Sequence, residues 1–204
     1  MDNRSTSDSI APAVRNEVYQ NHEGVGMKPD KRLQAFNEKR GALLDEMGAL
    51  DPAKLVAKPL PGKWSMIEII EHLVLAERAV LQGLPEPSRL NERERRLKHR
   101  FSYVLVMFVL KYGIPVQVPS PAMVPQGDRS LGELRRLWDE NQEWLRAYIS
   151  RLDRKGFRRA VFEHPIAGPM SVEQALRMDQ VHLDTHVRQI RRLQRLLDAI
   201  APLA

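Results

Sequence analysis

Apolar residues recur every three to four positions along most of the chain after residue 30, with charged residues between them. This spacing is typical of one face of an α-helix. Applied along the chain, the pattern predicts five helices, over residues 31–49, 66–84, 89–112, 131–152 and 172–199. No segment alternates between apolar and polar residues well enough to predict a β-strand.

Local signals mark the ends of these helices. In a capping box, a serine and a glutamate or glutamine three residues later bond each other's backbone amides. This spacing occurs at three predicted starts, in the pairs Ser65 and Glu68, Ser130 and Glu133, and Ser171 and Gln174. Gly113 and Pro115 predict the end of the third helix, since glycine favours a left-handed cap and proline cannot continue a helix. The proline-rich residues 116–127 predict an extended crossover.

The predicted fold is all-α, a four-helix bundle with a long crossover connection that contains an extra helix. The length of 204 residues suits one domain. Residues 1–29 show no clean period, so we expect a loosely structured N-terminal arm there and the bundle domain over residues 30–204.

Composition narrows the class of protein. With 43% hydrophobic and 28% charged residues, the chain has the balance of a globular protein rather than a disordered one. The longest apolar run, Val104–Leu110, is far shorter than the roughly 20 residues that span a bilayer. Residues 1–26 contain no apolar block typical of a signal peptide, so the cytoplasm is the expected compartment. The absence of cysteine excludes disulfides, thiolate ligands and a cysteine nucleophile.

The net charge of +6 is compatible with an anionic partner such as nucleic acid or a membrane surface. The basic residues, however, are spread over segments 89–100, 146–159 and 188–195, without regularly interleaved aromatic residues for base stacking. A solvated basic surface explains the charge more simply. The sequence therefore favours a small-molecule substrate over nucleic acid and predicts no membrane partner.

The last predicted helix carries two histidines on its apolar face. At 100° per residue, His182 and His186 fall in the middle of a stripe that includes Met178 and Ile190, while arginines occupy the other side. Their Cβ atoms should lie about 6 Å apart, so both imidazoles can bind one metal ion. Alternatively, each is a core histidine whose two ring nitrogens find hydrogen-bond partners.

His72, in the predicted helix 66–84, is a candidate third ligand. It lies at the margin of that helix's apolar stripe, beside the small residues Ala76, Ala79 and Gly83. Small neighbours let another helix approach closely or leave a cavity. Taken alone, His72 is equally well interpreted as a residue at the boundary of the core.

Two other residues have chemistry of interest. Glu77 falls within the same apolar stripe, where a carboxylate must be paired or hydrogen-bonded. We interpret it first as the partner of an arginine on a neighbouring helix, and alternatively as a pocket residue. His164, in the predicted loop before the last helix, is a turn residue or a pocket residue. His22 and His99 lie in polar stretches and are predicted to be solvated.

Together these residues resemble the DinB/YfiT-like four-helix metalloproteins, over most of the chain from about residue 31. Three segments carry the resemblance in order, 61–73 with His72, 164–171, and 182–190 with His182 and His186. The resemblance implies a bundle with a long crossover, a homodimer, and one divalent ion bound by the three histidines. Zn, Ni, Fe and Mn all accept imidazole ligands, so the metal is not distinguished.

The resemblance also implies an activity, because known members transfer low-molecular-weight thiols or carry out thiol-dependent isomerisation. We expect a metal-dependent thiol S-transferase or hydrolase acting on a small electrophile, with the sulfur supplied by a thiol cosubstrate. The alternative is a non-catalytic metal- or ligand-binding stress-response protein. Bound imidazoles normally need acceptors for their second nitrogen, and the candidates are Glu68, Asp179 and Gln189. Metal affinity should fall as pH drops through about 6.5, the value for free imidazole.

Overall fold

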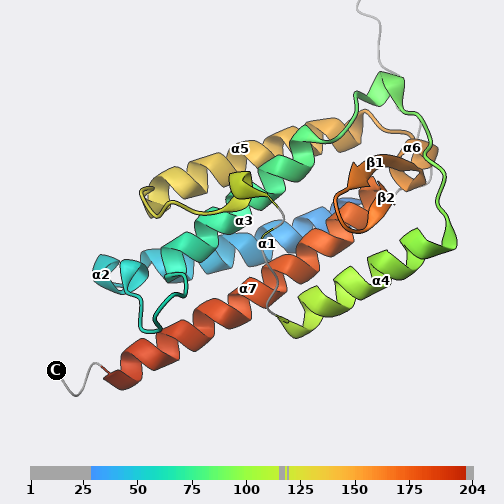
Figure 1. Ribbon diagram of the computed structural model, residues 1–204. Coiled ribbons are helices and arrows are strands. Elements are labelled where there is room, and N and C mark those ends of the chain that lie inside the picture. The colour runs from blue at the N-terminus through green and yellow to red at the C-terminus, as the bar shows by residue number, and fades with distance from the viewer. Residues whose placement is uncertain (1–28, 115–117, 119, 201–204) are drawn as a thin grey trace, which may run out of the picture.

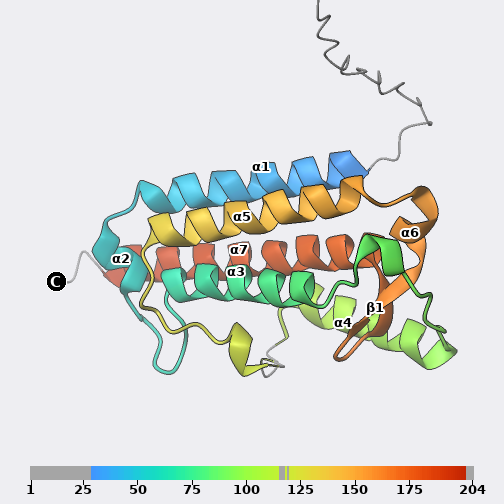
Figure 2. The same cartoon turned by 90° about the horizontal axis from the view of Figure 1, so that it is seen from above.

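Four long helices form the bundle in the computed structural model, which describes residues 29–114, 118 and 120–200. They are α1 (Pro29–Gly48), α3 (Met66–Gln82), α5 (Leu131–Ser150) and α7 (Val172–Ile200), and they run side by side (Figures 1 and 2). A fifth helix, α4 (Leu97–Tyr112), lies outside the bundle against α7. The all-α class and the extra helix in the connection are confirmed. Apart from residue 29, the predicted N-terminal arm lies outside the described residues.

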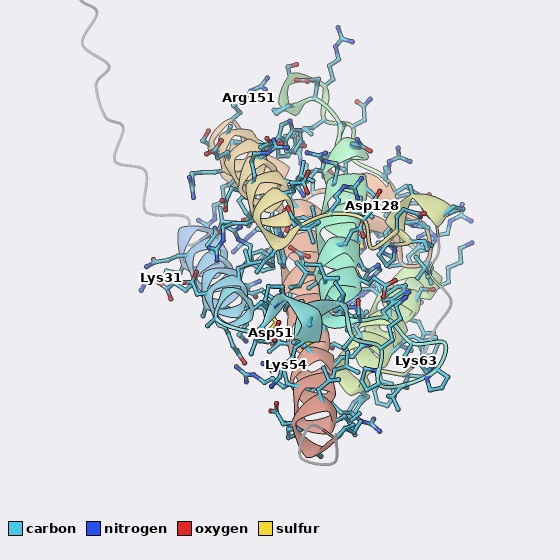
Figure 3. The ribbon with its side chains drawn as sticks, turned by 90° about the vertical axis from the view of Figure 1, so that its left-hand side faces the viewer. Lys31, Asp51, Lys54, Lys63, Asp128 and Arg151 are labelled. Carbon is cyan, nitrogen blue, oxygen red and sulfur yellow. The ribbon has the colours of Figure 1, made fainter. Side chains whose placement is uncertain are left out.

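Each bundle helix contributes its apolar stripe to a common core. Residues of all four meet in one cluster that includes Leu44, Met47, Ile69, Ile70, Leu134, Trp138, Leu183 and Ile190. Helix α3 is the most enclosed of the four, since 12 of its 17 residues are buried. Charged residues such as Lys31, Asp51 and Lys63 lie at the periphery (Figure 3). Burial of these stripes orients the helices and so determines which side chains face one another.

The predicted helix signals are found in the structure. Ser65 and Ser130 form complete capping boxes with Glu68 and Glu133. At the start of α7, the amides of Ser171 and Gln174 bond each other's side chains at 3.2 Å. Gly113 ends α4 in the left-handed region, at φ 63°.

Helix α4 begins eight residues later than the predicted start at residue 89, and this prediction was wrong. A 3-10 turn η1 (Pro87–Arg89) and an irregular segment precede it. The amide of Arg93 in this segment donates to the carbonyl oxygen of Ala160 at 2.8 Å instead of entering a helix. Residues 91–96 contain no apolar side chain to bury, so nothing favours a helix there.

The prediction of no strands was also wrong, since a short antiparallel hairpin precedes α7. Its strands are β1 (Ala160–His164) and β2 (Gly168–Ser171). Both are buried over successive residues, and this removes the alternation by which a strand is recognised. The sequence also missed two five-residue helices, α2 (Pro52–Val56) and α6 (Arg154–Arg158). The predicted crossover contains the 3-10 turn η2 (Pro121–Met123), while residues 116, 117 and 119 lie outside the described residues.

Candidate metal centre

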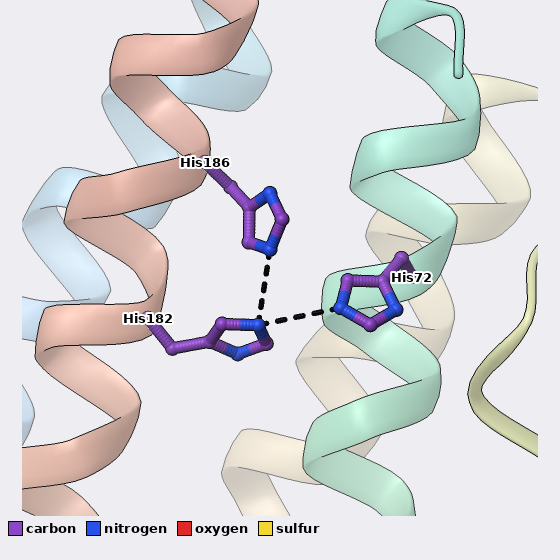
Figure 4. Close-up of side chains that lie close together, drawn as sticks. All are labelled: His72, His182 and His186. Carbon is purple, nitrogen blue, oxygen red and sulfur yellow. Dashed lines mark hydrogen bonds between the residues drawn. The ribbon is translucent and has the colours of Figure 1, made fainter. Parts of the chain in front are cut away.

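Three histidines from two helices converge in the space between α3 and α7 (Figure 4). His182 and His186 extend from successive turns of α7, and His72 faces them from α3. The Nε2 atom of His182 lies 3.3 Å from that of His72 and 3.0 Å from that of His186. One potential ligand nitrogen from each residue lies within 4.8 Å of the others. The bundle therefore brings together the three histidines that the sequence singled out.

The spacing of these nitrogens matches a shared ion. With metal–nitrogen bonds of about 2.1 Å, two ligands lie about 3.0 Å apart at octahedral angles and about 3.4 Å apart at tetrahedral angles. The two measured separations, 3.0 Å and 3.3 Å, fall between these values. Three ligands on one side of an ion leave the coordination positions on its other side open to water or a substrate.

Hydrogen bonds at the outer nitrogens determine the tautomers. The Nδ1–H of His72 donates to the carbonyl oxygen of Met123 at 2.8 Å, because a carbonyl only accepts. The Nδ1–H of His186 donates in the same way to Oε1 of Gln189 at 2.9 Å. In the neutral imidazole both residues then present an unprotonated Nε2 to His182. One proton on His182 can serve only one of these lone pairs, whereas a cation satisfies all three nitrogens.

Burial keeps these imidazoles in the form that binds metals. Desolvation lowers the pKa of His72, and it lowers the pKa of His182 well below the ordinary value, with the charges of the other two histidines adding to the effect. Desolvation and the charge of His72 together lower the pKa of His186 to about 4. Neutral imidazole is therefore the favoured state at neutral pH.

The site opens onto a cavity of about 1150 Å³ between α3, α4, α7 and the hairpin. On α3 the lining extends from His72 to Leu81, a distance of about 14 Å at the rise of an α-helix. Small residues leave this space, as the sequence suggested: Ala76 and Ala79 lie on α3, and Gly83 follows it directly. Away from the histidines the lining is mainly apolar, with members that include Leu81, Leu84, Val106, Leu110, Leu145, Phe162, Met170 and Leu176.

Two carboxyl groups line the cavity near the histidines. Glu77 is 4% exposed and accepts hydrogen bonds from Trp138 Nε1 and Gln142 Nε2, both at 2.8 Å. The predicted arginine partner was therefore wrong, since the nearby Arg40 bonds Asp139 instead. Desolvation raises the pKa of Glu77 to about 7, and desolvation with the charge of Glu77 raises the pKa of Asp179 well above its usual value. The pair can thus hold a proton beside the histidines near neutral pH.

The other candidate residues lie in different places. Gln189 bonds His186, as described, whereas the carboxylate of Glu68 accepts from the Ser65 amide at 2.7 Å and from Lys58 at 2.8 Å. Glu68 therefore caps α3 and does not serve a histidine. His164 lines the cavity, and its Nδ1 accepts from two amides of the hairpin turn, including that of Ala167 at 3.0 Å.

Sequence reasoning missed the groups that hold His72. Its acceptor is the main-chain oxygen of Met123, which no side-chain pattern can indicate. Glu71 holds the segment that follows Met123 against α3. Its carboxylate accepts hydrogen bonds from the amides of Gln126 at 3.0 Å and Gly127 at 2.7 Å and pairs with Arg129. By helical position Glu71 lies outside the apolar stripe that contains Glu77, so no pattern in the sequence predicted its burial.

A sequence model of the DinB superfamily matches residues 35–190, a range that contains all three histidines. No curated protein sequence matches the chain. One solved structure resembles it with a TM-score of 0.47 and 20% identity, covering 88% of this chain and 94% of that chain. Its description reads "YfiT from Bacillus subtilis is a probable metal-dependent hydrolase with an unusual four-helix bundle topology".

Proposed function

The chain belongs to the DinB superfamily, and from this premise we propose that it is a metal-dependent enzyme acting on a small molecule. His72, His182 and His186 are the proposed ligands of one divalent ion. The observation that carries the proposal is the convergence of three imidazole nitrogens at the wall of a large cavity. A purely structural cluster would not need to face open space of that size.

A divalent ion bound there would act as a Lewis acid on a substrate oxygen, or would favour the thiolate form of a bound thiol. The protein's own groups supply the remaining functions. The hydrogen bonds from His72 to Met123 and from His186 to Gln189 hold two imidazoles in the binding tautomer. Asp179, which lines the cavity one turn before His182, is placed to take up or deliver a proton.

Transfer of a thiol and hydrolysis are the two reactions we propose for this site. The chain has no cysteine, so a nucleophilic sulfur has to come from a low-molecular-weight thiol cosubstrate. The apolar lining between α3, α4 and α7 favours a small electrophile with an apolar body, whose reactive group lies toward the histidines. The alternative function, a metal- or ligand-binding protein without turnover, uses the same ligands.

Metal analysis of His182→Ala, with His99→Ala as the matched control, tests the site. We expect the first variant to lose more than about 100-fold in metal affinity, because it removes the central ligand. The control histidine is on α4 and its Nδ1 accepts from the Arg96 amide, so its removal should leave binding unchanged. Stoichiometric metal in a variant lacking all three imidazoles would show that the site is assigned wrongly.

A panel of thiol-plus-electrophile and ester substrates then tests the chemistry. Turnover should depend on added metal and disappear in His182→Ala. Full turnover without bound metal would contradict the enzyme proposal, and bound metal without turnover on any substrate would favour the binding protein.

The pH dependence of metal binding adds a separate check. Protons compete with the ion only when the imidazoles titrate, and burial lowers the pKa of all three. Affinity should therefore persist below the pH of about 6.5 expected for free imidazole, and fall toward the pKa of His186 near 4. A binding midpoint at the free-imidazole value would show that the ligands are solvated.

A further inference from the structure

Helix α4 has an apolar face that the described part of the protein does not cover. Six large side chains on it are between 49% and 80% exposed, namely Leu97, Phe101, Val104, Leu105, Phe108 and Tyr112. At 100° per residue they occupy a single arc about 100° wide. Figure 1 shows α4 at the edge of the molecule, with α7 and the hairpin on its other side.

The opposite face of α4 provides its attachment to the protein. Tyr103, Val106, Met107 and Leu110 are partly buried and pack against a core cluster whose members come from the bundle helices, α6 and the hairpin. The outer residues therefore contribute little to the fold. Exposed apolar patches of this kind mark interaction sites more often than chance.

Charges identify the kind of partner. No acidic residue occurs in α4, and its exposed basic residues border the apolar arc on both sides. By helical position, Lys98 lies at one edge of the arc and Arg100 and Lys111 lie at the other. An apolar face with aromatic residues and basic edges is typical of a helix that lies in a membrane interface, where long basic side chains reach the headgroups.

We propose that the outer face of α4 docks on an anionic lipid surface. The apolar arc enters the boundary between headgroups and acyl chains, and the three basic residues bind the lipid phosphates. Among the described residues no helix is long and apolar enough to cross a bilayer, so the attachment is peripheral. The proposal does not depend on the metal site, and it departs from the sequence-based expectation of no membrane partner.

A second copy of the chain fits this face less well. A two-fold symmetric contact apposes the same patch of both molecules. Two α4 helices would then bring basic edges together with no acidic residue in either helix to offset the repulsion. An anionic surface takes up the apolar arc and its charged edges together.

Co-sedimentation with vesicles tests the proposal on the full chain. We expect binding to phosphatidylglycerol–phosphatidylcholine vesicles, weakening at high salt, and much less binding to phosphatidylcholine alone. Phe101→Ser with Phe108→Ser should reduce binding at least about tenfold. Replacing Lys98, Arg100 and Lys111 by Gln should reduce it by about fivefold for each charge. Trp144→Ser, an exposed aromatic on α5, is the matched control and should leave binding unchanged.

Two further measurements keep the outcome clear. The chain has three tryptophans and none lies in α4, so Tyr112→Trp compared with the parent should show a blue shift of emission when anionic vesicles are added. Light scattering on the same proteins reports oligomeric state. Absence of binding to anionic vesicles, binding that survives the Phe substitutions, or a dimer abolished by those substitutions would each overturn the proposal.

Discussion

Helices α3 and α4 are both rich in apolar residues, yet the protein surrounds one and covers only half of the other. Of the 17 residues of α3, 12 are buried, including His72 and three glutamates, whereas none of the 16 residues of α4 is buried. The difference comes from their neighbours, since α3 lies between α5, α7, α2 and η2, while α4 rests on α7 and β2. Apolar content alone therefore does not show whether a helix is enclosed.

Enclosure has a consequence for polar residues. Each buried acid of α3 has donors arranged around it, such as the amides and Arg129 at Glu71, and Trp138 and Gln142 at Glu77. Removing one partner from such a group leaves the others without solvent to replace it. On α4, water is available to every exposed charge. Substitutions on α3 should therefore change stability, and those on the outer face of α4 should change only association.

The largest effect is expected for Glu71→Ala. This change leaves the Arg129 guanidinium and two main-chain amides without their acceptor, and it should lower the free energy of unfolding by about 3–5 kcal/mol. Lys98→Ala removes a charge on the exposed side of α4, and it should change the free energy of unfolding by less than about 0.5 kcal/mol. Urea unfolding of both variants checks the difference. Similar losses from the two would contradict the contrast between the helices.

The next largest difference in stability is expected between two leucines, one on each helix. Leu73 on α3 is 2% exposed and Leu97 on α4 is 80% exposed. Leu73→Ala should cost about 2–5 kcal/mol through the lost burial and the cavity, while Leu97→Ala should stay within about 0.5 kcal/mol. Thermal and urea unfolding measure both. A cost above about 2 kcal/mol for Leu97→Ala would show that its face is covered in the folded state.

The smallest effect concerns pH. Because the pKa of Glu77 is raised to about 7 in the folded state, the folded protein binds more protons than the unfolded chain between pH 4.5 and 7. The contribution of Glu77 to the stability of the fold is therefore fully present at low pH and is lost as the pH rises toward 7. Glu77→Gln should remove this dependence, so its free energy of unfolding should rise by about 2–3 kcal/mol relative to the wild type between pH 5 and 8.

This measurement belongs on metal-free protein, since a bound cation would lower carboxyl pKa values nearby. Asp179→Asn should change the pH dependence of the free energy of unfolding in the same direction, because the pKa of Asp179 is raised as well. A constant difference between wild type and Glu77→Gln across this range would show that Glu77 is already ionised at pH 5.

Much of the candidate site could be predicted from local pattern. The helical period placed His182 and His186 on one buried face and made His72 a candidate third ligand, and the resemblance to the DinB family then implied all three. Glu77 was expected to be buried because of its place in the stripe, but its partners were not predictable. Trp138 and Gln142 belong to α5, and only packing decides which of its residues approach α3.

The sequence by itself determined where the main helices lie, how Ser65 and Ser130 cap them, and which residues share a face, because these properties depend on neighbours within a few residues. Only the tertiary structure decided that three imidazoles meet, that the carbonyl of Met123 serves His72, and that one face of α4 stays exposed. These facts depend on contacts between residues far apart in the chain, such as the 110 positions between His72 and His182. Burial removes water from such contacts, so it is the packing partner, rather than the local pattern, that determines the chemistry of each side chain.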